Sequence, residues 1–159
     1  MSKMIDQELL VRWSDDIYRF TMLVMDEMRQ PRDYGDGQVL NMVEIHTIAM
    51  IAEEPGLCIS EVAKKWNRTL GAASRNINRL VDKGYVIKRK EEGDDKTIHL
   101  YLTARGQKLA EQHHNLDLQV TNEFSKIIAE KHEWSELVTF HDVLETLYDF
   151  YKARGQQAQ

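Results

Sequence analysis

The chain has 159 residues, of which 42% are hydrophobic and 30% are charged, and this length suits one compact domain with extensions better than two domains. It contains no run of 18 apolar residues and no apolar stretch of signal-peptide type near its start, so we expect a cytoplasmic protein with no membrane partner. The single cysteine, Cys58, excludes an internal disulfide.

The charge is unevenly distributed along the chain. Its 21 basic and 26 acidic side chains give a net charge of −5, which by itself disfavours a polyanionic partner. Residues 56–106, however, carry 11 basic and 6 acidic side chains, so this segment is positive and the remainder is strongly negative. A basic segment in an acidic chain indicates a surface for an anionic partner such as nucleic acid.

Two helices are predicted in the first third of the chain. Apolar residues recur every three or four positions from Leu10 to Met28, which is typical of a long amphipathic helix. One proline and two glycines predict a loop over Gln30–Gly37. A second helix is predicted over Val39–Ala52, and its dense apolar content indicates that it is buried.

The next segment predicts a helix-turn-helix. Leu57–Ile59 suits a small strand, and Ser60 can cap a short helix over Glu61–Trp66. After a tight connection, Thr69 can cap a second helix, which ends at Gly84, where a left-handed conformation costs little. Two short helices joined by three or four residues form this motif.

A hairpin follows the second of these helices directly. Alternating apolar and polar residues predict strands at Tyr85–Lys90 and Thr97–Leu102, with a turn at Glu91–Asp95. This order is typical of a winged helix-turn-helix, so we predict a mainly α fold of the α+β winged-helix class. The winged helix-turn-helix DNA-binding region is expected within residues 38–103.

The chain then predicts two terminal helices. Thr103 can cap the first, whose apolar residues recur from Leu109 to Ile127, and the second has a similar stripe from Leu137 to Tyr151, with a polar tail from Gly155. No sheet or bundle of their own covers these stripes, so the simplest burial is against each other and a second copy. We therefore predict a homodimer, with residues 1–34 and 104–154 as the helical dimerisation region.

The second helix of the motif is predicted to recognise double-stranded DNA. Ala73, Ile77 and Leu80 share the inward face, so the opposite face is free to approach base edges. Arg75 can donate two hydrogen bonds to guanine, and Asn76 or Asn78 can pair with adenine. Small residues at the helix start allow close approach, and the other cations suit phosphates or the minor groove. The predicted DNA-binding residues are Lys64, Arg68, Thr69, Gly71, Ala72, Arg75, Asn76, Asn78, Arg79, Lys88, Lys90 and Lys96.

Three segments, Ile59–Ala63, Thr69–Val86 and Gly93–Gly106, resemble the MarR family of winged-helix regulators. The resemblance implies a homodimer that represses transcription at a palindromic operator and responds to an effector. In that family an Asp-x-Arg motif places an arginine in the minor groove, whereas this chain has Asp94 and Lys96 at the matching positions. Because a hydrated ammonium fits a narrow groove less well, we expect the helix to supply most of the specificity.

The resemblance extends to an effector. Within the family, Glu44–Ile48 together with Thr69–Gly71 is similar to the branch that represses fatty-acid synthesis genes and responds to acylated carrier protein. The resemblance thus implies a small molecule or an acyl carrier protein as effector. Trp13, Ile17, Met42, Ile45, His46 and Met50 are the candidate lining of an effector cavity, although such a stripe is also typical of a core.

The residues also allow other functions. His46 together with His113 or His114 could bind zinc, which is the main alternative, and Cys58 between apolar neighbours fits an inert small hydrophobe better than a redox switch. A winged-helix module for protein contacts is a further alternative. No phosphate loop, HExxH, GxSxG or Cys–His arrangement occurs, so neither an enzyme nor a cofactor is predicted.

Overall fold

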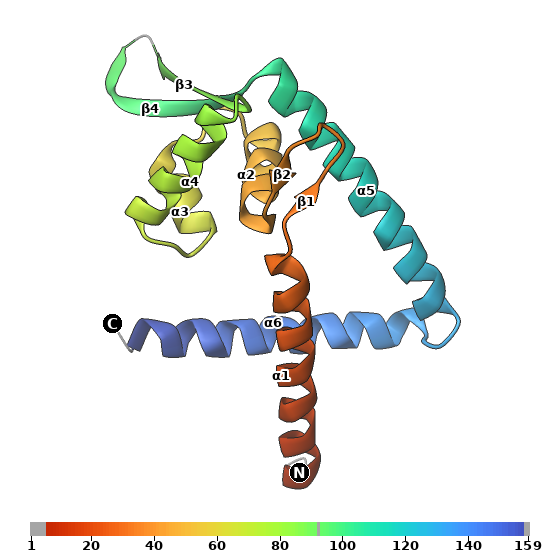
Figure 1. Cartoon of the computed structure of the whole chain (residues 1–159). Helices are drawn as coiled ribbons and strands as arrows, with labels where there is room; N and C mark the ends of the chain where they lie inside the picture. The colour runs from red at the N-terminus through yellow and green to blue at the C-terminus, as the bar shows by residue number, and fades with distance from the viewer. Residues whose placement is uncertain (1–5, 92, 158–159) are drawn as a thin grey trace. The chain divides into compact units, whose positions relative to one another are not determined.

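The computed structural model describes residues 6–91 and 93–157, and the chain divides into two compact units, Met1–Asn115 and Leu116–Gln159. The chain is mainly helical with two small antiparallel hairpins, which confirms the predicted winged-helix class (Figure 1). The helices are α1 (Gln7–Arg29), α2 (Met42–Glu53), α3 (Ile59–Lys65), α4 (Leu70–Asp82), α5 (Ala104–Ala129) and α6 (Trp134–Gln157). The strands are β1 (Arg32–Asp33), β2 (Val39–Leu40), β3 (Val86–Glu91) and β4 (Asp94–Leu102). None of the helices in these ranges is both long and apolar enough to cross a membrane.

One apolar core joins α2, α3, α4 and the β3–β4 hairpin, which together we call the winged-helix lobe. The inward face of α4 is the one that the sequence predicts, since Ala73, Ile77 and Leu80 are all buried. Tyr85, between α4 and β3, and Leu109, in α5, are fully buried in the same cluster. The remaining fully buried members are Leu40, Ile45, Ile48, Ile51, Val62, Val86 and Leu100.

The start of α2 differs from the prediction. The helix begins at Met42 rather than Val39, because the Asn41 side chain accepts from the Glu44 N–H at 3.0 Å and Glu44 accepts from the Asn41 N–H at 3.1 Å. This reciprocal capping box fixes the first turn. Val39 and Leu40, which precede this cap, form β2 instead of the first helical turn. This strand pairs with β1, which lies inside the segment that the sequence predicts as a loop.

The start of α3 also differs. The Cys58 N–H donates to the Glu61 carboxylate at 2.8 Å, so the helix begins at Ile59 and Ser60 is not its cap. The small strand predicted at Leu57–Ile59 is reduced to one bridge between Cys58 and His99 of β4. The cap of α4 is confirmed, because the Thr69 hydroxyl accepts from the Ala72 N–H at 3.2 Å.

The wing is a longer hairpin with a tighter turn than predicted. Its register runs from Val86 opposite Leu102 to Glu91 opposite Asp94, so the ends of the predicted turn belong to the strands. Gly93 has φ +90°, a left-handed conformation that a glycine adopts without strain.

The first turn of α5 is anchored to the wing. The Thr103 hydroxyl accepts from the Gly106 N–H at 3.0 Å, which confirms its predicted role as a cap. A Cβ at Gly106 would stand 2.2 Å from the Tyr85 carbonyl oxygen, so only glycine allows this approach. The buried residues of α5 all lie between Gly106 and His113, whereas α6 continues through the predicted polar tail to Gln157.

Candidate nucleic-acid interface

The outward face of α4 is open and presents donors. Gly71, Arg75 and Asn78 are all exposed on this face, opposite the buried stripe. A Cβ built at Gly71 would meet no atom within 4 Å. The first turn of α4 therefore has the space that close approach to a base pair needs.

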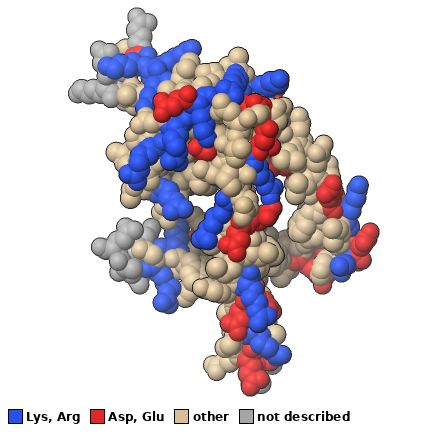
Figure 2. All heavy atoms as spheres, viewed as in Figure 1, with Lys and Arg blue, Asp and Glu red and all other residues tan. Residues whose placement is uncertain are grey.

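Basic side chains surround this face. Lys64 at the end of α3, Arg68 in the connection, and Lys88, Arg89 and Lys90 on β3 are all exposed. Figure 2 shows Lys and Arg gathered over the part of the surface that α3, α4 and the hairpin form in Figure 1. Such a patch attracts a polyanion through displacement of its condensed counterions. Of the predicted wing cations, the Lys96 side chain lies outside the described residues.

Asn76 is a correction to the predicted set. Its side chain is buried, and its amide donates to the Thr47 hydroxyl of α2 at 2.9 Å, so it cannot contact a base from this position. The Trp66 indole N–H donates to the same oxygen at 3.2 Å, and the hydroxyl donates to the Val43 carbonyl at 2.6 Å. The helical period placed Asn76 at the edge of the exposed face, and the acceptor on α2 draws it inward.

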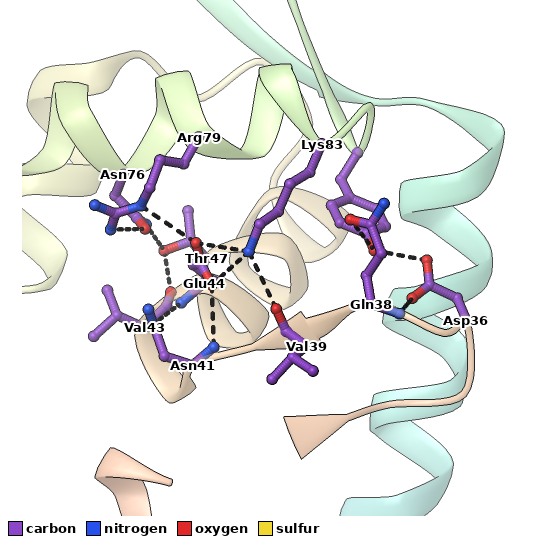
Figure 3. Close-up of polar contacts among 11 residues, drawn as sticks. Asp36, Gln38, Val39, Asn41, Val43, Glu44, Thr47, Asn76, Arg79 and Lys83 are labelled. Carbon is purple, nitrogen blue, oxygen red and sulfur yellow. Dashed lines mark hydrogen bonds and ion pairs between the residues drawn. The ribbon is translucent and has the colours of Figure 1, made fainter. Parts of the chain in front are cut away.

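A buried carboxylate lies beside this contact (Figure 3). The Glu44 side chain is 4% exposed and accepts from Lys83 Nζ at 3.0 Å and from Arg79 Nε at 3.3 Å. Arg79, a predicted phosphate ligand, also donates to Asn76 at 3.3 Å, yet its side chain is 55% exposed. Sequence reasoning missed Lys83 as an internal anchor, although its spacing of four from Arg79 places both cations on one helix face. These contacts join α4 and the residue after it to α2.

A hydrogen bond joins the wing to the recognition face. Lys88 Nζ of β3 donates to Asn78 Oδ1 of α4 at 2.5 Å. The guanidinium of Arg89, which sequence reasoning also missed, lies 5.5 Å from the centre of the Tyr101 ring. The base of the hairpin is therefore held against the helix on the side that would meet a duplex.

A second polar cluster anchors the loop between α1 and α2. The Tyr85 hydroxyl donates to Asp36 at 2.7 Å, and Arg105 donates to the same carboxylate at 2.9 Å. Burial acts to raise the pKa of Asp36, but the hydrogen bonds from Tyr85, the Gln38 N–H and Arg105 outweigh it, so the pKa is lowered. The pKa of Tyr85 is raised, first by burial and then by the neighbouring carboxylate. Asp36 is thus held ionised in the folded state.

The predicted effector residues are dispersed within the first unit. Trp13 and Ile17 are half-buried on α1, Ile45 is in the core, and His46 and Met50 are half-buried on α2. Met42 lines a cavity of about 390 Å³, together with Met28, Arg29, Asn41, Val43, Val62, Trp66, Arg68, Ala72, Ala73, Asn76 and Arg79. None of the other five lines this cavity, and their effector role stays a prediction.

The histidines of the zinc alternative lie partly together. The ring centroids of His46 and His113 are 4.7 Å apart with the planes at 88°, and His46 also contacts the Trp66 ring edge-to-face. His114 is exposed. Among the side chains that the structure describes, no three of His, Cys, Asp or Glu are grouped closely enough to bind a metal ion.

The family model of MarR matches residues 40–96, which run from the end of β2 into the wing. The chain has the MarR winged-helix fold. Solved structures of this fold include Streptococcus pneumoniae FabT in complex with DNA, with a TM-score of 0.67 and 24% identity over 93% of this chain and 99% of that one. Lactococcus lactis ZitR, described as a zinc-responsive MarR family member, has a TM-score of 0.69 and 12% identity over 89% and 99% of the two chains.

A transcriptional regulator is also similar to this chain in sequence. The Bacillus subtilis protein YhjH, an uncharacterized HTH-type transcriptional regulator, is 26% identical over 103 residues, which are 64% of this chain and 57% of the relative. The match thus spans little more than half of that relative's length.

Proposed function

We propose that this chain is a MarR-type transcriptional repressor that binds duplex DNA sequence-specifically as a homodimer. The observation that carries the proposal is the outward face of α4, where Gly71, Arg75 and Asn78 are exposed and surrounded by basic side chains. Donors at this position can reach base edges, while the surrounding cations contact phosphates. The match of residues 40–96 to the MarR model supports the same reading.

The dimer forms part of this proposal. In the described residues, the exposed large apolar side chains lie on α1 and in residues 116–157, with Val39, Leu70 and Ile98 as the exceptions. Such a quantity of apolar surface is unusual for a monomer and marks an interface. We assign residues 1–34 and 104–154 to dimerisation and residues 38–103 to DNA binding. Two recognition helices related by a twofold axis would contact half-sites about 34 Å apart on a palindromic operator.

We also propose that an effector changes the spacing of the two recognition helices. The resemblance of Glu44–Ile48 and Thr69–Gly71 to the fatty-acid branch favours an acyl carrier protein or a small molecule as that effector. Sequencing the genomic fragments that the purified protein retains tests the pathway. Capture of lipid-synthesis promoters is expected, and their absence from the retained set contradicts this branch.

The DNA-binding role is tested by two substitutions with different expected patterns. Arg75→Ala removes a base contact, so it should cost about 1–3 kcal/mol at one base position. Lys64→Ala removes a phosphate contact, so it should weaken all sequences alike and reduce the salt slope by about one. Fluorescence anisotropy with a series of duplexes at several salt concentrations measures both. Affinity that does not fall with added salt would contradict the proposal.

A further inference from the structure

The amide of Asn78 is oriented by the wing. Asn78 lies on the exposed face of α4, three residues after Arg75, and Lys88 Nζ donates to its Oδ1 at 2.5 Å. A hydrogen bond from an ammonium is stronger than one between neutral groups. The contact therefore fixes the amide with its oxygen toward the lysine and its NH2 group away from it.

This orientation changes what Asn78 can recognise. An asparagine pairs with adenine by accepting from the N6 amino group and donating to N7 at the same time. Lys88 already donates to the Asn78 oxygen. An adenine N6 amino group that donates to the same oxygen would therefore lie next to the Lys88 ammonium, which disfavours this contact. The oxygen keeps a second lone pair, but a donor placed on it would lie beside the ammonium. The pair therefore offers several N–H donors and one acceptor that the neighbouring cation weakens.

Asn76 cannot supply an adenine contact in place of Asn78. Its amide donates to Thr47 and its oxygen accepts from Arg79, and the side chain is 4% exposed. Contacts between elements therefore remove Asn76 from adenine pairing and disfavour such pairing at Asn78. The neighbouring Arg75 adds further donors to the same face.

We infer that Asn78 and Lys88 act as one donor-rich unit that selects guanine over adenine in the major groove, with Lys88 as a specificity-determining residue. Guanine presents two acceptors, O6 and N7, whereas adenine presents one acceptor and one donor, and thymine one acceptor and a methyl group. Two donors therefore match guanine best. The inference rests on the proposed DNA-binding function and specifies the base that one part of the site prefers.

The test is selection from a duplex library by the full-length protein and three variants. The operator position that Asn78 contacts is identified as the one whose base preference disappears in Asn78→Ala. At this position the wild type should prefer guanine to adenine by about tenfold or more. Lys88→Ala should reduce that ratio to near one or invert it, because the freed amide can then pair with adenine.

Lys90→Ala is the matched control. Lys90 lies two residues along the same strand and is also exposed, so its removal takes away an equal charge. It should weaken all sequences alike and keep the preference for guanine.

The outcomes separate the inference from the proposed function. A wild-type preference for adenine at the Asn78 position, equal changes of base preference in Lys88→Ala and Lys90→Ala, or an Asn78→Ala variant with unchanged preferences overturns the inference alone. Failure of the wild type to bind any duplex in a salt-dependent way overturns the proposed function itself.

Discussion

The winged-helix lobe buries its apolar side chains, whereas α1 and residues 116–157 leave theirs exposed. α2, α4 and the hairpin share one core, and their internal polar groups are bonded to one another around Thr47 and Glu44. α1 has no buried residue, although its stripe contains Trp13, Ile17 and Phe20. The difference fits the proposal that the lobe is stabilised within one chain, while the terminal helices pack against a second copy.

The largest loss of stability is expected at Gly106, where the backbone of α5 lies against the Tyr85 carbonyl. Gly106→Ala would place a Cβ 2.2 Å from the Tyr85 carbonyl oxygen, which also accepts from the Thr103 N–H at 2.9 Å. Because the Tyr85 carbonyl is held in place by this hydrogen bond, the substitution should lower the free energy of unfolding by about 3 kcal/mol. Urea denaturation measures the change. Gly155→Ala, where a Cβ meets nothing within 4 Å, should instead raise it slightly. Similar losses from both would show that the close approach is unimportant.

The next largest loss of stability is expected at Thr47, whose hydroxyl makes three hydrogen bonds. Thr47→Val keeps the shape but leaves the Asn76 amide and the Trp66 indole N–H without this acceptor. Burying two unsatisfied donors should cost about 2–3 kcal/mol of unfolding free energy. Thr139→Val is the control, because Thr139 is exposed on α6 and makes the same donation to the carbonyl four residues earlier. If both variants lose the same stability, the Thr47 contacts contribute nothing beyond helix propensity.

A smaller effect should separate the terminal helices from the lobe. Leu144 on α6 is 42% exposed in the single chain, so Leu144→Ala should weaken self-association about tenfold and leave the unfolding of the lobe nearly unchanged. Sedimentation equilibrium measures the first quantity and chemical denaturation the second. Glu145→Ala, at the adjacent exposed position, should alter neither. Unchanged association in Leu144→Ala would remove α6 from the proposed dimer interface.

The smallest effect depends on pH. Because the pKa of Asp36 is lowered in the folded state, its ionised form stabilises the fold above its ordinary value near 4, and this contribution is lost as the pH falls through the folded pKa. Asp36→Asn should cost about 1 kcal/mol at pH 7 and less at each step below pH 4. Unfolding curves between pH 7 and 3 measure the difference. A difference that grows on acidification would contradict the assigned direction.

Much of the site could be predicted from sequence because it lies on one helix with a clear period. The spacing of Ala73, Ile77 and Leu80 identified the inward face, and with it the exposure of Arg75. The assignment of Asn76 was wrong because residues at the edge of a helix stripe lie near both environments. Its position was decided by an acceptor 29 residues earlier, on α2.

The sequence by itself determined the order of helices, the winged hairpin, the basic segment and the exposed donors of α4, since each follows from local periodicity, turn residues or composition. Only the tertiary structure decided which polar side chains remain for a duplex. Glu44 of α2 pairs with Arg79 and Lys83. The Thr47 hydroxyl accepts from Asn76, and Lys88 orients Asn78. Hydrogen bonds between elements distant in sequence leave no periodic signal, so they emerge only when the helices are packed together.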